Sequence, residues 1–160
     1  MADHDYRELR RHASSVVAAA GVPSDPSFDE LRQFMETMRG RRIVIAHLPS
    51  MTEGVCGVWF SRRDVDVDVV CCDTTSRYWK QTVYHEWGHM LLGHSEDEGA
   101  AIDVASSLAP LIPLEAIRFA LARSSFDTRS EAEAEAVGDV LGLLVAKSAT
   151  RRRTGFGSVL

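Results

Sequence analysis

Hydrophobic residues recur with helical spacing in several stretches of the chain. Residues 5–20 place leucine and valine side chains among alanines and end at Gly21. Residues 28–38 repeat hydrophobic positions at i, i+3, i+4 and i+7. Another helical pattern follows the capping residues at 73–76 and runs to Gly93. These patterns predict helices, as do three further stretches at 102–108, 114–122 and 128–149.

Three segments in the first half of the chain have the composition of β-strands. They are residues 42–46, 55–60 and 65–69. The last segment alternates strictly between valine and aspartate, which predicts a strand with one buried face and one solvent-exposed face. The short connection between the second and third segments favours a hairpin.

The composition is that of an ordinary folded domain. The chain has 160 residues, of which 45% are hydrophobic and 26% charged, and this excludes a disordered or low-complexity chain. A net charge of −5 provides no overall basic field for holding DNA or RNA, and three cysteines argue against a disulfide scaffold. The chain lacks both an apolar run of roughly 18 residues and the apolar stretch of a signal peptide. We therefore expect one cytoplasmic domain over residues 1–160, with a helical segment (1–40), a core (42–149) and a frayed tail (150–160).

The most informative motif is His-Glu-x-x-His, formed by His85, Glu86 and His89. Two histidines four residues apart on a helix are separated by about 40°, so both rings can reach one ion. The glutamate is close enough in angle to act on a water molecule at that ion. The opposite side of the helix is hydrophobic, with Trp79, Val83, Tyr84, Trp87, Met90 and Leu91. The pattern predicts a helix that packs its back on the core and presents two zinc ligands, His85 and His89, and a general base, Glu86, to a cleft. If the histidines were ordinary surface residues, the glutamate would be left unexplained.

A nearby histidine, His94, suggests a longer zinc motif in which a third histidine follows the helix. The register does not fit, because Leu92 and Ser95 occupy the positions where that motif needs glycine and histidine. We expect His94 to have a capping or outer-shell role. Residues 64–68 resemble the start of a calcium loop, but Val69 replaces the glycine that such a loop needs, and an alternating strand explains them better.

The third zinc ligand is expected from the acidic start of the final helix. With Glu131 placed at zero, Glu135 falls near 40° beside Asp139, on a face that looks solvated. Glu133 falls near 200°, inside a hydrophobic stripe. The stripe is formed by Val137, Val140, Leu141 and Leu144. Burying an ionised carboxylate there is costly unless it is paired or bound to metal, so Glu133 is the predicted third ligand, with a fourth position for water. The alternative is Glu135, with Asp139 behind a histidine.

Two stretches carry a resemblance to a known family. Residues 81–94 read QTVYHEWGHMLLGH, and residues 131–138 read EAEAEAVG. Together with the strand and hairpin before them, they resemble the ImmA/IrrE family of small bacterial and phage zinc-peptidase domains, over about residues 42–146. The resemblance implies an α+β fold, with a small, mostly antiparallel three-stranded sheet packed against the zinc helix and several further helices. It also implies a metal-binding glutamate at Glu133 and a partner that is a separately encoded Xre-type helix-turn-helix repressor.

The predicted activity is that of a zinc endopeptidase. Zinc would lower the pKa of a water molecule and polarise the scissile carbonyl, and Glu86 would pass the water proton to the leaving amine. Tyr78 is a weak candidate for the oxyanion donor, and an extended substrate could pair with an exposed edge of the sheet. The alternative is a zinc-stabilised binding module that controls a repressor by contact alone. The presence of Glu86 favours hydrolysis, because a structural zinc site needs no general base. Neither direct nucleic-acid binding nor a membrane is expected.

Overall fold

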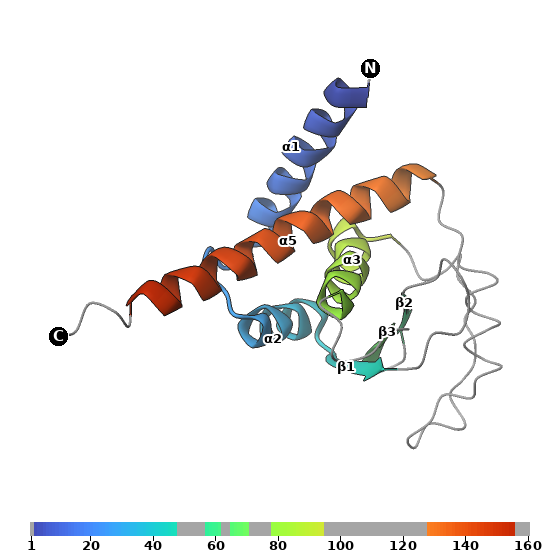
Figure 1. Ribbon diagram of the computed structural model, residues 1–160. Coiled ribbons are helices and arrows are strands. Elements are labelled where there is room, and N and C mark those ends of the chain that lie inside the picture. The colour runs from blue at the N-terminus through green and yellow to red at the C-terminus, as the bar shows by residue number, and fades with distance from the viewer. Residues whose placement is uncertain (1, 48–56, 62–64, 71–77, 95–127, 156–160) are drawn as a thin grey trace.

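The structure is a computed structural model that describes residues 2–47, 57–61, 65–70, 78–94 and 128–155 (Figure 1). Helices account for most of these residues. The helices are α1 (Ala2–Ala20), α2 (Phe28–Arg39), α3 (Trp79–Leu92) and α5 (Thr128–Gly155), and the strands are β1 (Arg42–His47), β2 (Gly57–Ser61) and β3 (Val65–Val70). The long helix α5 runs across the molecule, with α1 on one side of it and α3 on the other, and the sheet lies beyond α3 (Figure 1).

The helices and strands expected from the hydrophobic pattern are present where the structure describes the chain. The last helix was predicted to end at residue 149, but it continues to Gly155, so the expectation of a frayed tail is wrong for residues 150–155. The predicted stretches at 73–76, 102–108 and 114–122 lie outside the described residues. Among the helices of the described ranges, none combines the length and the apolar character that crossing a bilayer requires.

The sheet has the strand order β1-β3-β2. Strand β3 pairs with β2 in antiparallel fashion, which confirms the predicted hairpin. Strand β1 pairs with β3 in parallel, with Arg42 opposite Val65 and His47 opposite Val70, and this is the longer of the two ladders. The expected fold class, α+β with a mostly antiparallel three-stranded sheet, is therefore wrong. The described chain is mostly helical, and its sheet is built around a parallel pair. Side-chain alternation indicates that a segment is a strand, but it carries no information about the direction of its neighbour.

A buried ion pair joins the end of α2 to the sheet. Asp66 on β3 is fully buried, and its carboxylate accepts hydrogen bonds from Arg39 Nε at 2.7 Å and Nη2 at 3.1 Å. The same carboxylate accepts from Trp59 Nε1 at 3.3 Å, and the Arg39 guanidinium lies 4.8 Å from the centre of the Trp59 ring. A buried carboxylate is tolerated when a bidentate arginine and a further donor satisfy its oxygens. Of the two faces that alternate along β3, the one that carries Asp66 is buried.

The start of α2 is held to the far end of α5. Ser27 caps the helix and forms a capping box with Glu30. Glu30 also accepts a hydrogen bond from Arg152 Nη2 at 2.7 Å. The hydrogen bond from the backbone N–H of Ser27 is the largest cause, and that from Arg152 the next, of a pKa of Glu30 that is lowered to about 2. Ser148, which is buried, donates to the Asp25 carbonyl at 3.1 Å. These contacts give the last turns of α5 tertiary partners, which explains why the helix extends beyond the hydrophobic repeat.

Glycines allow α3 and α5 to cross at short range. A Cβ atom at Gly88 would lie 2.5 Å from the backbone oxygen of Ala134. A Cβ at Gly138 would lie 3.0 Å from the backbone nitrogen of His85, and one at Gly142 would lie 3.1 Å from Gln81 Oε1. The face of α5 that the sequence suggested to be solvated is therefore its contact with α3. This contact brings the acidic first turns of α5 onto the histidine end of α3.

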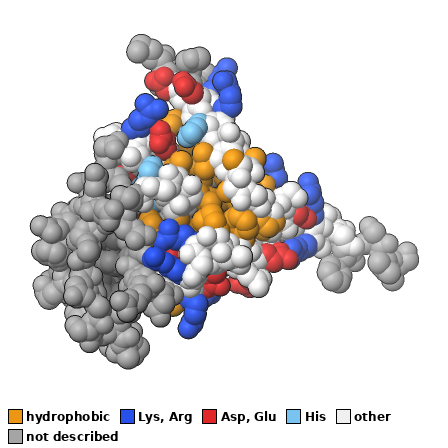
Figure 2. Space-filling model, turned by 180° about the vertical axis from the view of Figure 1, so that it is seen from behind, with side chains coloured by type: hydrophobic (Ala, Val, Ile, Leu, Met, Phe, Trp, Pro, Cys, Tyr) orange, Lys and Arg blue, Asp and Glu red, His pale blue; other side chains and the backbone are white. Residues whose placement is uncertain are grey.

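The reverse side of the molecule shows a gathering of hydrophobic side chains with charged groups of both signs around it (Figure 2). This mixed surface agrees with the modest net charge of −5. The face in this view shows no broad field of one sign among the described residues.

Candidate metal centre

Helix α3 carries the three residues of the His-Glu-x-x-His motif in the middle of the fold. His89 is 1% exposed and Glu86 is 7% exposed, while His85 is only partly buried. The hydrophobic back of the helix is buried as expected at four positions, namely Val83, Tyr84, Trp87 and Met90. Helix α5 crosses α3 beside the motif (Figure 1), and a Cβ at Gly138 would lie 3.0 Å from the backbone nitrogen of His85.

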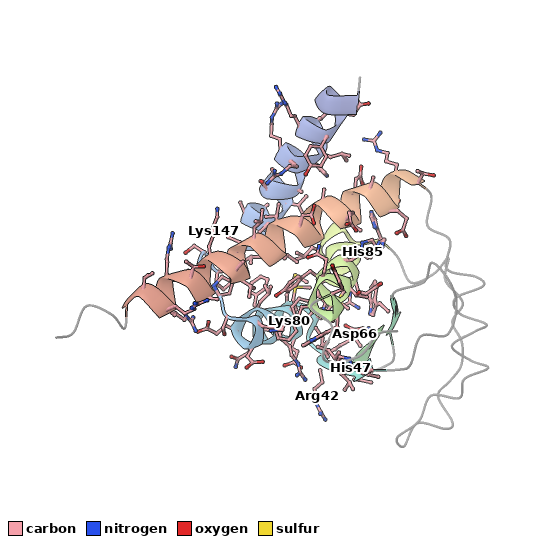
Figure 3. All side chains as sticks on the ribbon, viewed as in Figure 1. Arg42, His47, Asp66, Lys80, His85 and Lys147 are labelled. Carbon is pink, nitrogen blue, oxygen red and sulfur yellow. The ribbon has the colours of Figure 1, made fainter. Side chains whose placement is uncertain are left out.

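The ligand atoms of three side chains converge where α3 meets α5. His85 Nε2 and His89 Nε2 lie 3.1 Å apart. Glu131 Oε2 lies 3.2 Å from His85 Nε2, and Glu131 Oε1 lies 3.5 Å from His89 Nε2. Figure 3 shows His85 on α3, on the side that faces the acidic end of α5. Four ligands at about 2.0–2.1 Å from a tetrahedral zinc ion are separated from one another by roughly 3.3 Å. The observed separations match that spacing.

The donor chemistry around His85 also fits a cation. Its Nδ1 lies 3.1 Å from Glu135 Oε2, and a carboxylate can only accept a hydrogen bond, so the contact fits the tautomer with its hydrogen on Nδ1. The other nitrogen, Nε2, then directs a lone pair toward the Glu131 carboxylate. In that tautomer two electron-rich groups face each other at 3.2 Å, and a metal ion between them would stabilise the arrangement. The residues present therefore fit a metal ion held by His85, His89 and Glu131.

The third position of this group differs from the sequence prediction. Glu133 was the predicted ligand, but its Oε1 accepts a hydrogen bond from Arg129 Nε at 2.9 Å and its Oε2 lies 3.9 Å from His94 Nε2. The structure brings Glu131 to the two histidines instead. That Glu133 is a ligand stays a prediction, to be tested by measuring the metal affinity of variants. The geometry favours Glu131.

The spacing of glycines in α5 is the signal that could have identified Glu131. Gly138 follows Glu131 by seven residues, which is two helical turns, so the two lie on one face. Gly138 and Gly142 mark the face that meets α3, because only small residues fit at such a close crossing. The stripe containing Val137 and Leu141 is buried in the hydrophobic core, away from the metal ligands.

Glu135 and Asp139 occupy positions behind the histidine site. Glu135, the alternative ligand, contacts His85 at Nδ1 rather than at Nε2, where a metal would bind. Asp139, which was expected behind a histidine, accepts a hydrogen bond from Gln81 Nε2 at 3.0 Å. Tyr78, immediately before α3, is 76% exposed, and its role as an oxyanion donor stays a prediction.

His94 lies against His89 because of the way α3 ends. Gly93 adopts a left-handed conformation with φ 66°, and the N–H of His94 donates to the carbonyl of His89 at 3.1 Å. The chain therefore turns back over the last helical turn, and His94 Nδ1 comes to lie 2.8 Å from His89 Nδ1. The contact is made at Nδ1 of His89, whereas Nε2 is the atom near Glu131, and an outer-shell role for His94 stays a prediction.

The environment of His89 keeps its ring neutral. Burial, followed by electrostatic interaction with the neighbouring His85 and His94 side chains, lowers the pKa of His89 to about 3. At neutral pH the ring therefore has a lone pair on one nitrogen, as a metal ligand requires. Its exposure of 1% also excludes bulk water from that side of the site.

Comparison of the chain with protein-family models, with curated proteins and with solved structures finds no match.

Proposed function

We propose that this protein is a zinc-dependent endopeptidase whose metal is held by His85, His89 and Glu131. The observation that carries the proposal is the convergence of two imidazole Nε2 atoms and one carboxylate at 3.1–3.5 Å from one another. Nitrogen and oxygen ligands of this kind, in a set of three, are typical of catalytic zinc sites that keep a fourth position open. The glutamate that follows the first histidine supports a catalytic site over a structural one.

The proposed chemistry is hydrolysis of a peptide bond. When bound, zinc lowers the pKa of a water molecule to about 7 and polarises a carbonyl group. Glu86 accepts the proton of the attacking water as the oxygen bonds to the carbonyl carbon. The carbon–nitrogen bond then breaks, and Glu86 delivers the proton to the leaving amine. Glu135 and His94 hold the two histidine rings from behind.

The proposed substrate is a separately encoded helix-turn-helix repressor in the cytoplasm, as the resemblance to ImmA/IrrE domains suggests. The small sheet supports an extended substrate, because β1 and β2 are the outer strands among the described residues, in the order β1-β3-β2. An edge strand offers unpaired backbone groups that can hydrogen-bond to a peptide in extended conformation.

Zinc-loaded protein, incubated with the repressor encoded nearest to it, should cut that repressor at a single bond, and chelated protein should leave it intact. The hydrolysis step needs the metal to activate water, so cleavage and zinc occupancy should rise together. Mass spectrometry of the products measures the cut. If the repressor binds tightly and stays whole at full zinc occupancy, a regulatory binding module is the correct interpretation.

Zinc affinity should distinguish the two candidate glutamates. We expect Glu131→Ala and His89→Ala to lose stoichiometric zinc, because each removes a group at the converging site. We expect Glu133→Ala to keep stoichiometric zinc with an affinity lowered by about 10- to 100-fold, the usual effect of losing an outer-shell partner. Titration against a chromophoric chelator measures both values.

An exposed glutamate on α1 provides the matched control, and Glu8→Ala should leave zinc binding unchanged. Loss of stoichiometric zinc in Glu133→Ala, with none in Glu131→Ala, would show that Glu133 is the ligand after all.

A further inference from the structure

We propose that His94 and Glu133 form a positioning pair that fixes the tautomer and orientation of the His89 ring, so that Nε2 of His89 presents its lone pair to the metal. This inference rests on the proposed zinc site. It assigns a role to the histidine after the zinc helix and to a glutamate that the structure places beside that histidine.

The first step concerns the contact between the two rings. His89 Nδ1 and His94 Nδ1 lie 2.8 Å apart, which is a short hydrogen bond between nitrogen atoms. In such a bond one nitrogen carries the hydrogen and the other accepts it. Two arrangements are therefore available, and each one determines which nitrogen of His89 remains free.

In the first arrangement His89 Nδ1 donates to His94 Nδ1. Neutral His89 then has its lone pair on Nε2, the atom 3.1 Å from His85 Nε2 and 3.5 Å from Glu131 Oε1. In the second arrangement His94 donates, so His89 carries its hydrogen on Nε2. That hydrogen would occupy the direction in which a metal must bind, so only the first arrangement permits a zinc ligand.

Glu133 determines which arrangement is favoured. In the first arrangement His94 carries its hydrogen on Nε2, and this atom lies 3.9 Å from Glu133 Oε2. A negative charge near an N–H group is favourable, whereas in the second arrangement the same charge would face a lone pair. The Glu133 side chain is 18% exposed, so solvent screens this interaction only in part. Arg129 Nε, 2.9 Å from Glu133 Oε1, holds the carboxylate from the other side.

The backbone makes the contact between His94 and His89 well defined. The left-handed Gly93 turns the chain, and the His94 N–H donates to the His89 carbonyl at 3.1 Å. The two residues are thus joined by a backbone hydrogen bond and by a ring-to-ring hydrogen bond. The other proposed zinc histidine, His85, is oriented directly by Glu135. Each of the two histidines therefore has a carboxylate behind it: Glu135 contacts His85 itself, and Glu133 acts on His89 through His94.

The test compares two substitutions at His94. Phenylalanine fills similar space but cannot accept a hydrogen bond, whereas the Oδ1 atom of asparagine can take the place of Nδ1. We expect His94→Phe to weaken zinc binding by about 10- to 100-fold, and His94→Asn to recover most of that loss. The ligand-field bands of the cobalt-substituted protein should shift in His94→Phe while keeping the intensity of a four-coordinate site. Glu133→Gln should show a smaller loss of affinity in the same direction.

The control is His12→Phe, because His12 is an exposed histidine on α1, and its zinc affinity should equal that of the unmodified protein. Equal zinc affinities for His94→Phe, His94→Asn and the unmodified protein would overturn the positioning role and leave the zinc site intact. An equal loss in both His94 variants would indicate a merely structural role and would also overturn it. If the unmodified protein binds no zinc, the proposed function fails together with this inference. Should His94→Phe not fold, Glu133→Gln decides: a lower zinc affinity than that of the unmodified protein supports the pair, and an equal affinity overturns it.

Discussion

Replacing Glu86 by glutamine should leave the zinc content unchanged and lower the cleavage rate by at least about a hundredfold. The amide has almost the same size as the carboxylate, so the tightly packed site should accommodate it, but it cannot accept a proton from water. Glu86 is 7% exposed and lies on the helix that carries His85 and His89, so its substitution removes the proposed base and leaves the proposed ligands in place. Elemental analysis gives the zinc content, and mass spectrometry of the incubated repressor gives the rate.

The matched control for this experiment is Glu8→Gln, since Glu8 is an exposed glutamate on α1. Cleavage at the rate of the unmodified protein in Glu86→Gln would contradict the proposed role of Glu86. Repressor binding should be measured in parallel. A variant that binds the repressor and zinc normally, but does not cut, would show that the lost function is the proton transfer.

Introducing a methyl group at Gly88 should destabilise the protein by about 2–3 kcal/mol, as overpacking in a rigid interior does. The new Cβ would lie 2.5 Å from the backbone oxygen of Ala134, and a backbone atom cannot rotate away as a flexible side chain can. Alanine has a helix propensity that is better than that of glycine by about 1 kcal/mol, and this offsets part of the cost. We also expect weaker zinc binding, because α5 must move away from α3 and carry Glu131 with it. Urea unfolding of the metal-free protein measures the stability.

Gly155→Ala is the control for Gly88→Ala. Gly155 is the last residue of α5, and a Cβ there would meet nothing within 4 Å. Its free energy of unfolding should equal that of the unmodified protein or exceed it slightly. If Gly88→Ala unfolds at the same urea concentration as the unmodified protein, the two helices do not cross as closely as described.

The local pattern of the sequence determined the described helices and strands and two of the three candidate metal ligands. Hydrophobic spacing located the helices, and the alternation over 65–69 located β3, because these periods follow from the geometry of one segment alone. The spacing of His85 and His89 likewise placed both rings on one face of α3, and the structure has their Nε2 atoms 3.1 Å apart.

Only the tertiary structure decided how these segments meet. The parallel pairing of β1 with β3 depends on which strands become neighbours, and no single strand encodes that. The choice between Glu131 and Glu133 depends on which face of α5 approaches α3. The hydrophobic stripe of α5 indicated the core, but α5 approaches α3 closely at Ala134 and Gly138, and Gly138 lies on the face of Glu131. Two helix backbones pack this closely only where glycines leave room between them. The spacing of hydrophobic residues gives no information about where such glycines make a contact.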